Sequence, residues 1–551
     1  MSDAKYRPNE AVDFIVVGAG AAGGVVAKEL SAAGFSVVVL EQGPWHQTKD
    51  FMHDEVAVMY RSAFTNDFKK QPNTFRKTAA EPAKIQPAVE YGRMVGGGSV
   101  HYTSNYWRFH PEDFRERSAF GAVPGADLRD WPITYDDLEP YYTKAEWDLG
   151  ISGLGGSNPF DGPRSKPYPL PPMPVKSSGV LFERAAKKLG LHPFPAPMAV
   201  ISQPYRGRAA CSHCGFCEAF GCEMNAKSST LAALVPLAVK TGRCEIRPNS
   251  YVRKIEVGKN GRVQGAIYFD GQGREIFQRA KAVVVSANGA ETPRLLLMSK
   301  SKQFPHGLAN SNGNVGKYLM FDNGAMAMGY FEHPLNEYKS IVVTRVLHDY
   351  YRSDPKRGFY GGGGLDARFD YYPAGFALAG MPADMPQWGG EWKRAVGQYY
   401  THVGGVLAHA SSLSVERNNI SLDDTVKDAW GLPAMRVTFK NHPDDLKAVD
   451  FLIEKQKEIL ETAGAKKVWV DLSTTGDVTY SRHLMGTCRM GDDPRTSVVD
   501  QWNRAHDVRN LFLVDGSSLV TCARQQPTAT IQALAYRAAD YIGQAARRGE
   551  I

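Results

Sequence analysis

The chain has 551 residues, of which 43% are hydrophobic and 22% are charged, the composition of an ordinary globular protein rather than a disordered or fibrous one. This length excludes a single compact core, and roughly two to four domains are expected. The formal net charge is +7, but the chain has no long run of like charges and no basic stripe interleaved with aromatic residues. Nucleic acid is therefore not an expected partner.

The N-terminal segment MSDAKYRPNEAVDF has neither a basic and apolar signal region nor a twin arginine. No apolar run that follows it is long enough to cross a membrane. We therefore expect no direct membrane span.

The segment from residue 13 to residue 41 reads DFIVVGAGAAGGVVAKELSAAGFSVVVLE. It predicts an apolar strand over 14–17, a glycine turn, an amphipathic helix over about 21–33 and a second apolar strand over 37–40. Together these elements make a complete βαβ unit, which is the context that a dinucleotide-binding glycine motif requires.

The glycines of this unit have separate roles. Gly18 permits the tight turn, Gly20 lets the backbone approach a pyrophosphate, and Gly23 allows the helix to pack closely on the strand. Glu41 ends the second strand, where its carboxylate can accept hydrogen bonds from an adenosine ribose. The N-terminal position of the unit favours FAD over NAD.

Further segments with small residues follow along the chain. Near residue 91 stands YGRMVGGGSVHYTSNYWRF, whose three glycines allow backbone amides to approach a flat or anionic group. From residue 282 an apolar strand, AVVVSAN, runs into GAETPRLLLMS, which predicts another junction of strand and helix. Near the C-terminus stand SRHLMGTCRMG (481–491), VRNLFLVDGSSLV (508–520) and QQPTATIQALAYRAADYI (525–542).

Four of the seven cysteines lie in twelve residues, CSHCGFCEAFGC, with the spacing C-x2-C-x2-C-x4-C. The first three are spaced as in bacterial ferredoxins, and the fourth is displaced by one residue. Zinc is the main alternative, because four-cysteine zinc sites also use C-x2-C pairs, and disulfides or free thiols are a third. The candidate ligands are Cys211, Cys214, Cys217 and Cys222.

The order and spacing of these segments resemble the glucose-methanol-choline (GMC) family of FAD-dependent alcohol oxidoreductases over nearly the whole chain. Within that family the cysteine segment CGFCEAFGCEMNAKSST resembles the flavoprotein subunits of bacterial sugar and sugar-acid dehydrogenases of the gluconate 2-dehydrogenase type. The resemblance implies an α/β fold, α+β overall, in which a Rossmann-like FAD-binding domain is joined to a discontinuous substrate domain built on a mostly antiparallel sheet.

The resemblance also implies which residues contact FAD. His101 is placed beside the isoalloxazine ring, where several relatives attach the flavin covalently, although an ordinary hydrogen-bonded histidine is equally consistent with the sequence. The full set of implied contacts is Gly18, Gly20, Gly23, Glu41, Gly97, Gly98, Ser99, His101, Val252, Ala287, Asn288, Asp515 and Gly516.

Two further residues match the catalytic positions of the family. Oxidation of an alcohol requires a base for the hydroxyl proton, and a neutral imidazole is suited to this at neutral pH. His483 occupies the family's catalytic histidine position. Gln526 stands where relatives have histidine or asparagine, and since an amide is not a base it would orient the substrate hydroxyl or donate a hydrogen bond to the developing oxyanion.

The same resemblance implies an iron–sulfur cluster, [3Fe-4S] or [4Fe-4S], held by three or four of the clustered cysteines. A reduced flavin holds two electrons, and such a cluster can pass them on singly, whereas zinc cannot. We expect the FAD-binding domain to comprise residues 1–150, 225–320 and 480–551. Residues 151–224 would form a linker with the cysteine loop, and residues 321–479 the substrate-binding domain.

The expected activity is a dehydrogenase that oxidises a secondary or anomeric hydroxyl of a sugar, sugar acid or glycoside. Electrons would leave FAD through the iron–sulfur cluster for a cytochrome or quinone. The alternative is an oxidase that uses O2, with a structural metal at the cysteines. The expected partners are a small signal-bearing subunit and a cytochrome c subunit, with the protein co-exported to the periplasm or otherwise cytoplasmic.

Overall fold

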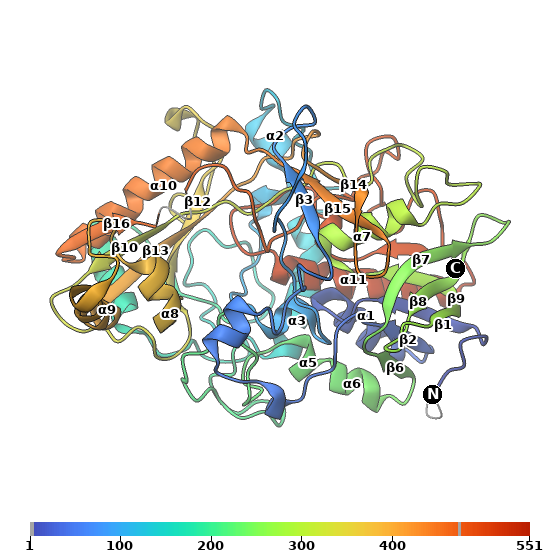
Figure 1. Cartoon of the computed structure of the whole chain (residues 1–551), viewed down its shortest axis with the longest axis horizontal. Coiled ribbons are helices and arrows are strands. Elements are labelled where there is room, and N and C mark those ends of the chain that lie inside the picture. Colours follow the sequence, from blue (N-terminus) through green and yellow to red (C-terminus); the bar gives the residue numbers. More distant parts are fainter. Residues whose placement is uncertain (1–4, 472–474) are drawn as a thin grey trace.

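The computed structural model describes residues 5–471 and 475–551, and its strands form three sheets (Figure 1). In Figure 1 the first sheet lies at one end of the molecule and the second sheet at the other. Each sheet draws on segments that are far apart in the sequence, as the following paragraphs describe.

The first sheet contains the predicted βαβ unit. Its parallel strands β2, β1 and β9 are buried, near-continuous runs of apolar residues, as expected for strands covered on both faces. An antiparallel meander extends it beyond β9. The order across the sheet is β6 (Cys244–Arg247), β2 (Val37–Leu40), β1 (Val12–Val17), β9 (Glu275–Val285), β8 (Val263–Phe269) and β7 (Tyr251–Val257), with β17 (Leu511–Leu513) also paired to β9.

The second sheet is antiparallel throughout its described pairings. The apolar face of α10 (Pro443–Thr462) packs on it, and Leu452 belongs to the same buried cluster as Val406 and Ala408. The order is β16 (Lys467–Val470), β10 (Met326–Tyr330), β13 (Val403–Ala410), β12 (Gly363–Arg368), β11 (Val343–Leu347) and β5 (Phe194–Pro195).

The third sheet joins the two parts of the chain. Its strands β14 (Asn419–Lys427) and β15 (Pro433–Thr438) come from the predicted substrate-binding region, whereas β3 (Asn73–Arg76) and β4 (Lys84–Ile85) come from the first 150 residues. β15 pairs with β3 in parallel. The boundaries between domains stay a prediction.

The helices begin and end where local chemistry favours it. In α3, Thr134 caps the N-terminus by accepting a hydrogen bond from the backbone amide of Asp137, and Gly150 ends the helix in a left-handed conformation. The helices are α1 (Ala21–Ala32), α2 (Glu116–Phe120), α3 (Tyr135–Leu149), α4 (Ser177–Lys188), α5 (Thr230–Ala233), α6 (Val235–Lys240), α7 (Asn288–Met298), α8 (Pro373–Gly375), α9 (Gly389–His402), α10 (Pro443–Thr462) and α11 (Thr528–Arg547).

The fold agrees with the predicted class: a Rossmann-like unit combined with a mostly antiparallel second sheet. The βαβ unit lies within two residues of its predicted limits, because its apolar runs and glycine turn determine it locally. Among the described residues, no helix combines the length and the apolar character needed to cross a membrane.

Candidate active site

A cavity of about 740 Å³ lies between the first and second sheets. On one side it is lined by Val17 and Leu40, at the carboxyl ends of β1 and β2, and on the other by residues of β13. Ligands of doubly wound sheets bind at this edge. Of the residues predicted to contact FAD or substrate, those that line the cavity are Gly18, Gly20, Glu41, Gly97, Gly98, Ser99, His101, Val252, Ala287, Asn288, His483, Asp515, Gly516 and Gln526.

Glycines form one wall of the cavity where two loops meet. Gly18 has a φ of +94°, and a Cβ there would lie 2.5 Å from the carbonyl oxygen of Ser286. A Cβ on Gly97 would lie 2.7 Å from the Cα of Gly20, so the loop that contains Gly97 approaches the first turn as closely as backbones allow. This wall of bare backbone suits the flat and anionic parts of FAD.

Gly23 does not line the cavity. A Cβ at this position would lie 1.9 Å from the carbonyl oxygen of Gly18, so Gly23 permits the close packing of α1 on the turn. Its contribution to the nucleotide site is therefore indirect, as the motif predicts.

Glu41 ends β2 beside the glycine turn. Its carboxylate accepts hydrogen bonds from the backbone amides of Ala19, at 2.9 Å, and Gly43, at 2.8 Å. Burial raises its pKa to about 7 in spite of these bonds. A ribose hydroxyl that donates to this carboxylate would stabilise its ionised form.

Asp515 lines the cavity and makes two hydrogen bonds to backbone amides. It caps the short helical turn Gly516–Ser518, accepting from the backbone amide of Ser517 at 2.8 Å. It also accepts from the backbone amide of Asn288, at 3.1 Å, and so joins the C-terminal segment to the turn after β9. Burial raises the pKa of its carboxyl.

His101 follows the glycine loop and is 8% exposed. Burial lowers its pKa to about 4, so the imidazole is neutral at physiological pH. Its Nε2 atom is buried and has no hydrogen-bond partner in the protein. An imidazole in this state can bind a ligand in the cavity through Nε2.

The predicted base, His483, is held by a carboxylate. Its Nδ1 lies 2.8 Å from Oδ2 of Asp322, another residue that lines the cavity. Burial would raise the pKa of Asp322, but hydrogen bonds from His409 and His483 outweigh it and hold the pKa below its usual value. An ionised Asp322 keeps the proton of His483 on Nδ1, which leaves a lone pair on Nε2.

A second histidine, His409 of β13, was not foreseen from the sequence. Its Nε2 lies 2.7 Å from Oδ2 of Asp366, and Arg368 donates two hydrogen bonds to the same carboxylate, at 2.7 and 2.8 Å. Burial would lower the pKa of His409, but its hydrogen bonds to Asp322 and Asp366 raise it overall.

Gln526 lies against His409. Its amide nitrogen is 3.0 Å from Nδ1 and 2.9 Å from Nε2 of the histidine ring. Its amide oxygen is buried and has no partner in the protein. Both ring nitrogens of His409 also have carboxylate partners, so either end of the Gln526 amide can face the ring, and the other end can orient a substrate hydroxyl or donate to an oxyanion.

Two arginines line the same part of the cavity, and both are paired with carboxylates. Arg482 lies 2.6 Å from Glu90 and 3.0 Å from Glu218. Arg368 is paired with Asp366 and lies 3.5 Å from Asp370. Neither guanidinium is left uncompensated to attract an anionic substrate.

The four clustered cysteines lie outside the cavity, in the loop that precedes α5. Cys217 is buried and Cys214 is exposed. Burial and, to a smaller extent, the other three thiols raise the pKa of Cys217 to about 12 although the ammonium of Lys227 lowers it. Only a bound cation would make thiolates stable here. In this described loop no three sulfurs lie within 4.8 Å of one another, whereas ligands of a single zinc ion lie roughly 4 Å apart.

Backbone hydrogen bonds connect the cysteine loop to the cavity wall. The amide of Ala219 donates to the carbonyl of His101 at 2.7 Å. The buried ammonium of Lys227 donates to the carbonyls of Tyr102, at 3.0 Å, and Cys217, at 2.6 Å. The segment that would contact the flavin and the segment that carries the thiols are thus in direct contact.

Comparisons with known proteins agree with this architecture. Two family models described as GMC oxidoreductase match residues 12–321 and 414–535. The chain belongs to the GMC oxidoreductases. It is 35% identical to 2-methyl-1,2-propanediol dehydrogenase of Mycolicibacterium austroafricanum, over 96% of this chain and 95% of that one. It is 31% identical to the gluconate 2-dehydrogenase flavoprotein of Pantoea cypripedii, over 96% and 93%.

A solved structure of formate oxidase shares the fold of this GMC oxidoreductase, with a TM-score of 0.66 and 15% identity over 99% of this chain and all of that one. The predicted family is therefore confirmed. The enzyme is an FAD-dependent oxidoreductase that acts on CH–OH groups, and the glycine wall, Glu41 and His101 fit that cofactor.

Proposed function

We propose that the enzyme is a dehydrogenase that oxidises a secondary or anomeric hydroxyl of a sugar, glycoside or related polyol to a carbonyl. The hydrogen bond between His483 and Asp322 at the cavity wall carries this proposal. His483 takes the hydroxyl proton at Nε2, and the carboxylate of Asp322 stabilises the imidazolium that results. The end of the Gln526 amide that faces away from His409 forms a hydrogen bond with the substrate and orients it. When bound, FAD accepts the hydride from the carbinol carbon.

The charges around the reacting groups favour an uncharged substrate over a sugar acid. Both arginines of the cavity are already compensated, and Glu90, Glu218 and Asp370 line it as well. A carboxylate ligand would find no free guanidinium there and would be repelled by these groups. Among the relatives, one is named for a diol and another for gluconate, so both an uncharged alcohol and a sugar acid should be assayed as substrates.

Matched substrates distinguish these classes. With an artificial electron acceptor we expect kcat/KM for uncharged polyols and glycosides to exceed that for gluconate by at least about tenfold. The carboxylate of gluconate would be repelled by the acidic side chains of the cavity, which costs on the order of 1 kcal/mol or more in the free energy of binding. A higher kcat/KM for gluconate would contradict the substrate class. No turnover with any alcohol would contradict the activity itself.

We further propose that Cys211, Cys214, Cys217 and Cys222 hold an iron–sulfur cluster of the [3Fe-4S] or [4Fe-4S] type. The spacing of the cysteines supports it, because the first three are spaced as in bacterial ferredoxins. The expected result is several equivalents of iron, and a cryogenic spin-resonance spectrum of the oxidised protein distinguishes the two cluster types. One equivalent of zinc without iron would overturn the proposal.

The position of the cysteine loop supports a path for electrons out of the cavity. The loop contacts His101 and Tyr102 directly, and Cys214 reaches the surface. We propose a cytochrome or quinone as the acceptor, a cytochrome c subunit and a small signal-bearing subunit as partners, and the periplasm as the location, reached by co-export.

Two measurements test this route. Turnover with a dye or a c-type cytochrome should greatly exceed turnover with O2, and rapid peroxide formation without a dye would favour the oxidase alternative. Expression beside its neighbouring genes should place the enzyme in a periplasmic or membrane complex. Recovery of the enzyme alone from the cytoplasm would contradict co-export.

A further inference from the structure

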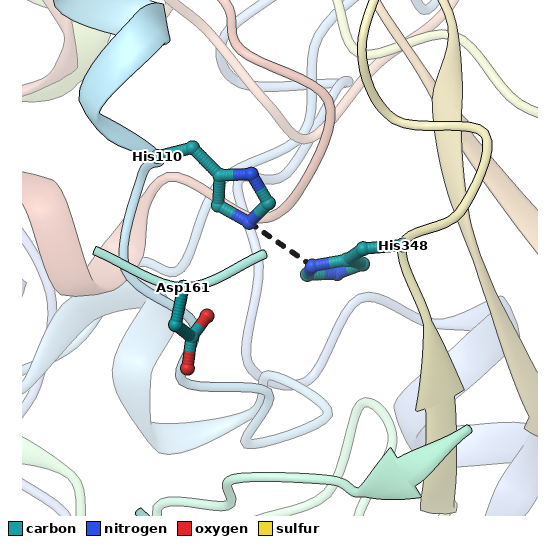
Figure 2. Close-up of side chains that lie close together, drawn as sticks. All are labelled: His110, Asp161 and His348. Atoms are coloured by element: carbon teal, nitrogen blue, oxygen red, sulfur yellow. Dashed lines mark hydrogen bonds between the residues drawn. The ribbon is translucent and has the colours of Figure 1, made fainter. Parts of the chain in front are cut away.

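A second cluster of metal-binding side chains lies on the far side of Trp107 from His409. His110, Asp161 and His348 each offer one ligand atom, and these three atoms lie within 4.8 Å of one another. Figure 2 shows the two imidazole rings joined by a hydrogen bond, with Asp161 on a separate segment and its carboxylate directed away from the rings in this view. None of the three lines the flavin cavity.

We propose that His110, His348 and Asp161 bind a single divalent metal ion of the zinc class. Two nitrogens and one carboxylate oxygen suit Zn²⁺, Co²⁺, Ni²⁺ or Cu²⁺, whereas Mg²⁺ and Ca²⁺ prefer oxygen ligands. Three protein ligands leave a position for water, which completes a tetrahedral set.

The distance between the two histidines fits a shared ion. Nε2 of His110 lies 3.1 Å from Nδ1 of His348. For Zn–N bonds of about 2.0–2.1 Å, two nitrogens on one ion lie roughly 2.9–3.4 Å apart for angles between 90° and the tetrahedral angle. The separation of the two nitrogens is thus compatible with a single ion bound by both rings.

Both imidazoles are buried and held in place. His110 stacks on Tyr351, and His348 packs edge-on against Phe194. Nδ1 of His348 contacts Nε2 of His110 and the amide nitrogen of Asn158, both at 3.1 Å, and an ion would replace these contacts, while the buried Nε2 has no partner and can carry the ring proton.

The third ligand and its support come from the loop between α3 and α4. Asn158 donates to Oδ1 of Asp161, at 2.7 Å, and contacts Nδ1 of His348, at 3.1 Å. It thereby holds the carboxylate beside the rings, as a supporting residue of a metal site does. Asp161 is only partly buried, which gives an ion a route in from solvent.

The ion would join three segments that are far apart in the chain. His110 precedes the helical turn Pro111–Phe114, and His348 follows β11 of the second sheet. Trp107 packs edge-on against both His348 and His409, with ring centroids 6.1 and 5.6 Å apart. A metal here would therefore stabilise the packing behind the active-site histidine.

The test uses full-length holoenzyme purified without chelators, with metals measured by mass spectrometry. The Asp161→Asn and His348→Gln variants remove ligands, and His192→Gln removes a nearby exposed histidine as the matched control. We expect one equivalent of a zinc-class metal in the wild type and the control, and its loss in both ligand variants. After chelation, Zn²⁺ titrated by calorimetry should bind at least about tenfold more weakly to Asp161→Asn than to the wild type.

Thermal unfolding provides a second readout. Zn²⁺ should raise the Tm of the chelated wild type more than it raises the Tm of chelated Asp161→Asn. If Zn²⁺ neither binds to the chelated wild type nor raises its Tm, the three residues are a hydrogen-bonded group only, and the proposal is overturned. Equal zinc uptake by the wild type and both ligand variants would also overturn it, because the ion would then lie elsewhere, such as at the cysteines.

Discussion

The two ends of the flavin cavity are built in different ways. At the nucleotide end, the glycine turn, α1 and Glu41 all belong to one βαβ unit of 30 residues, 12–41. At the reacting end, His483, Asp322 and His409 come from segments separated by more than 70 residues each and meet only in the folded chain. The residues of the nucleotide end are close together in the sequence, whereas those of the reacting end come together only through the tertiary fold.

This difference has a consequence for function. The nucleotide end presents backbone and one carboxylate, which suits a cofactor that many enzymes share. The reacting end presents a network of histidines, carboxylates and compensated arginines. Specificity for the substrate therefore lies in residues that no short motif contains. Substitutions at the two ends should separate catalysis from cofactor binding.

The largest effect is expected at the reacting end, from His483→Ala. Loss of the base should lower turnover with a dye acceptor at least about a hundredfold while FAD stays bound. The flavin absorbance of the purified variant supplies the control for cofactor content. Turnover close to that of the wild type would exclude His483 as the base.

Asp322→Asn should have the next largest effect, because the amide cannot stabilise the imidazolium of His483 as a carboxylate does. We expect kcat to fall on the order of ten- to a hundredfold with KM little changed. Asp322→Glu, which restores the charge, should recover part of kcat, and this recovery separates a positioning role from a merely structural one. Equal losses of kcat in Asp322→Asn and Asp322→Glu would argue against a role for the negative charge of Asp322.

At the nucleotide end, Gly97→Ala should disturb the backbone contact with Gly20. The added Cβ would lie 2.7 Å from the Cα of Gly20, and we expect a loss of about 1–3 kcal/mol in the free energy of unfolding, with weaker retention of FAD. Gly397→Ala is the control, since a Cβ there meets no atom within 4 Å. If denaturant unfolding gives the same free energy of unfolding for Gly97→Ala and Gly397→Ala, the close approach of Gly97 to Gly20 would be contradicted.

Glu41→Gln is expected to have the smallest effect, a weakening of FAD binding to the apoprotein of about tenfold. Its pH dependence is more informative. The pKa of Glu41 is raised to about 7, and ribose hydroxyls favour the ionised form, so the affinity of the wild type should rise with pH through this range. The glutamine variant should lack this dependence. If FAD affinity depends on pH in the same way in the wild type and in Glu41→Gln, the titrating group is a residue other than Glu41.

The sequence was sufficient to predict the first end of the cavity and the family. The βαβ unit was predictable because its strands, turn and helix are each determined by neighbouring residues. His483 and Gln526 were placed through the family resemblance, and the structure brings both to the cavity.

His409, Asp322 and Asp366 could not be found in this way. His409 and Asp366 are diagonal neighbours on the adjacent antiparallel strands β13 and β12, where His409 is opposite Gly364 and Asp366 is opposite Leu407, and their contact depends on a register that the sequence does not specify. The metal-ligating group of His110, Asp161 and His348 was missed for the same reason, since each ligand comes from a different segment.

Anaerobic reduction of the flavin by a single equivalent of an uncharged polyol tests the central claim most directly. We predict that the flavin absorbance bleaches in the wild type, that deuterium at the carbinol carbon slows the bleaching, and that His483→Ala slows it at least about a hundredfold. Bleaching at the same rate in His483→Ala, or no bleaching with any alcohol, would contradict the account.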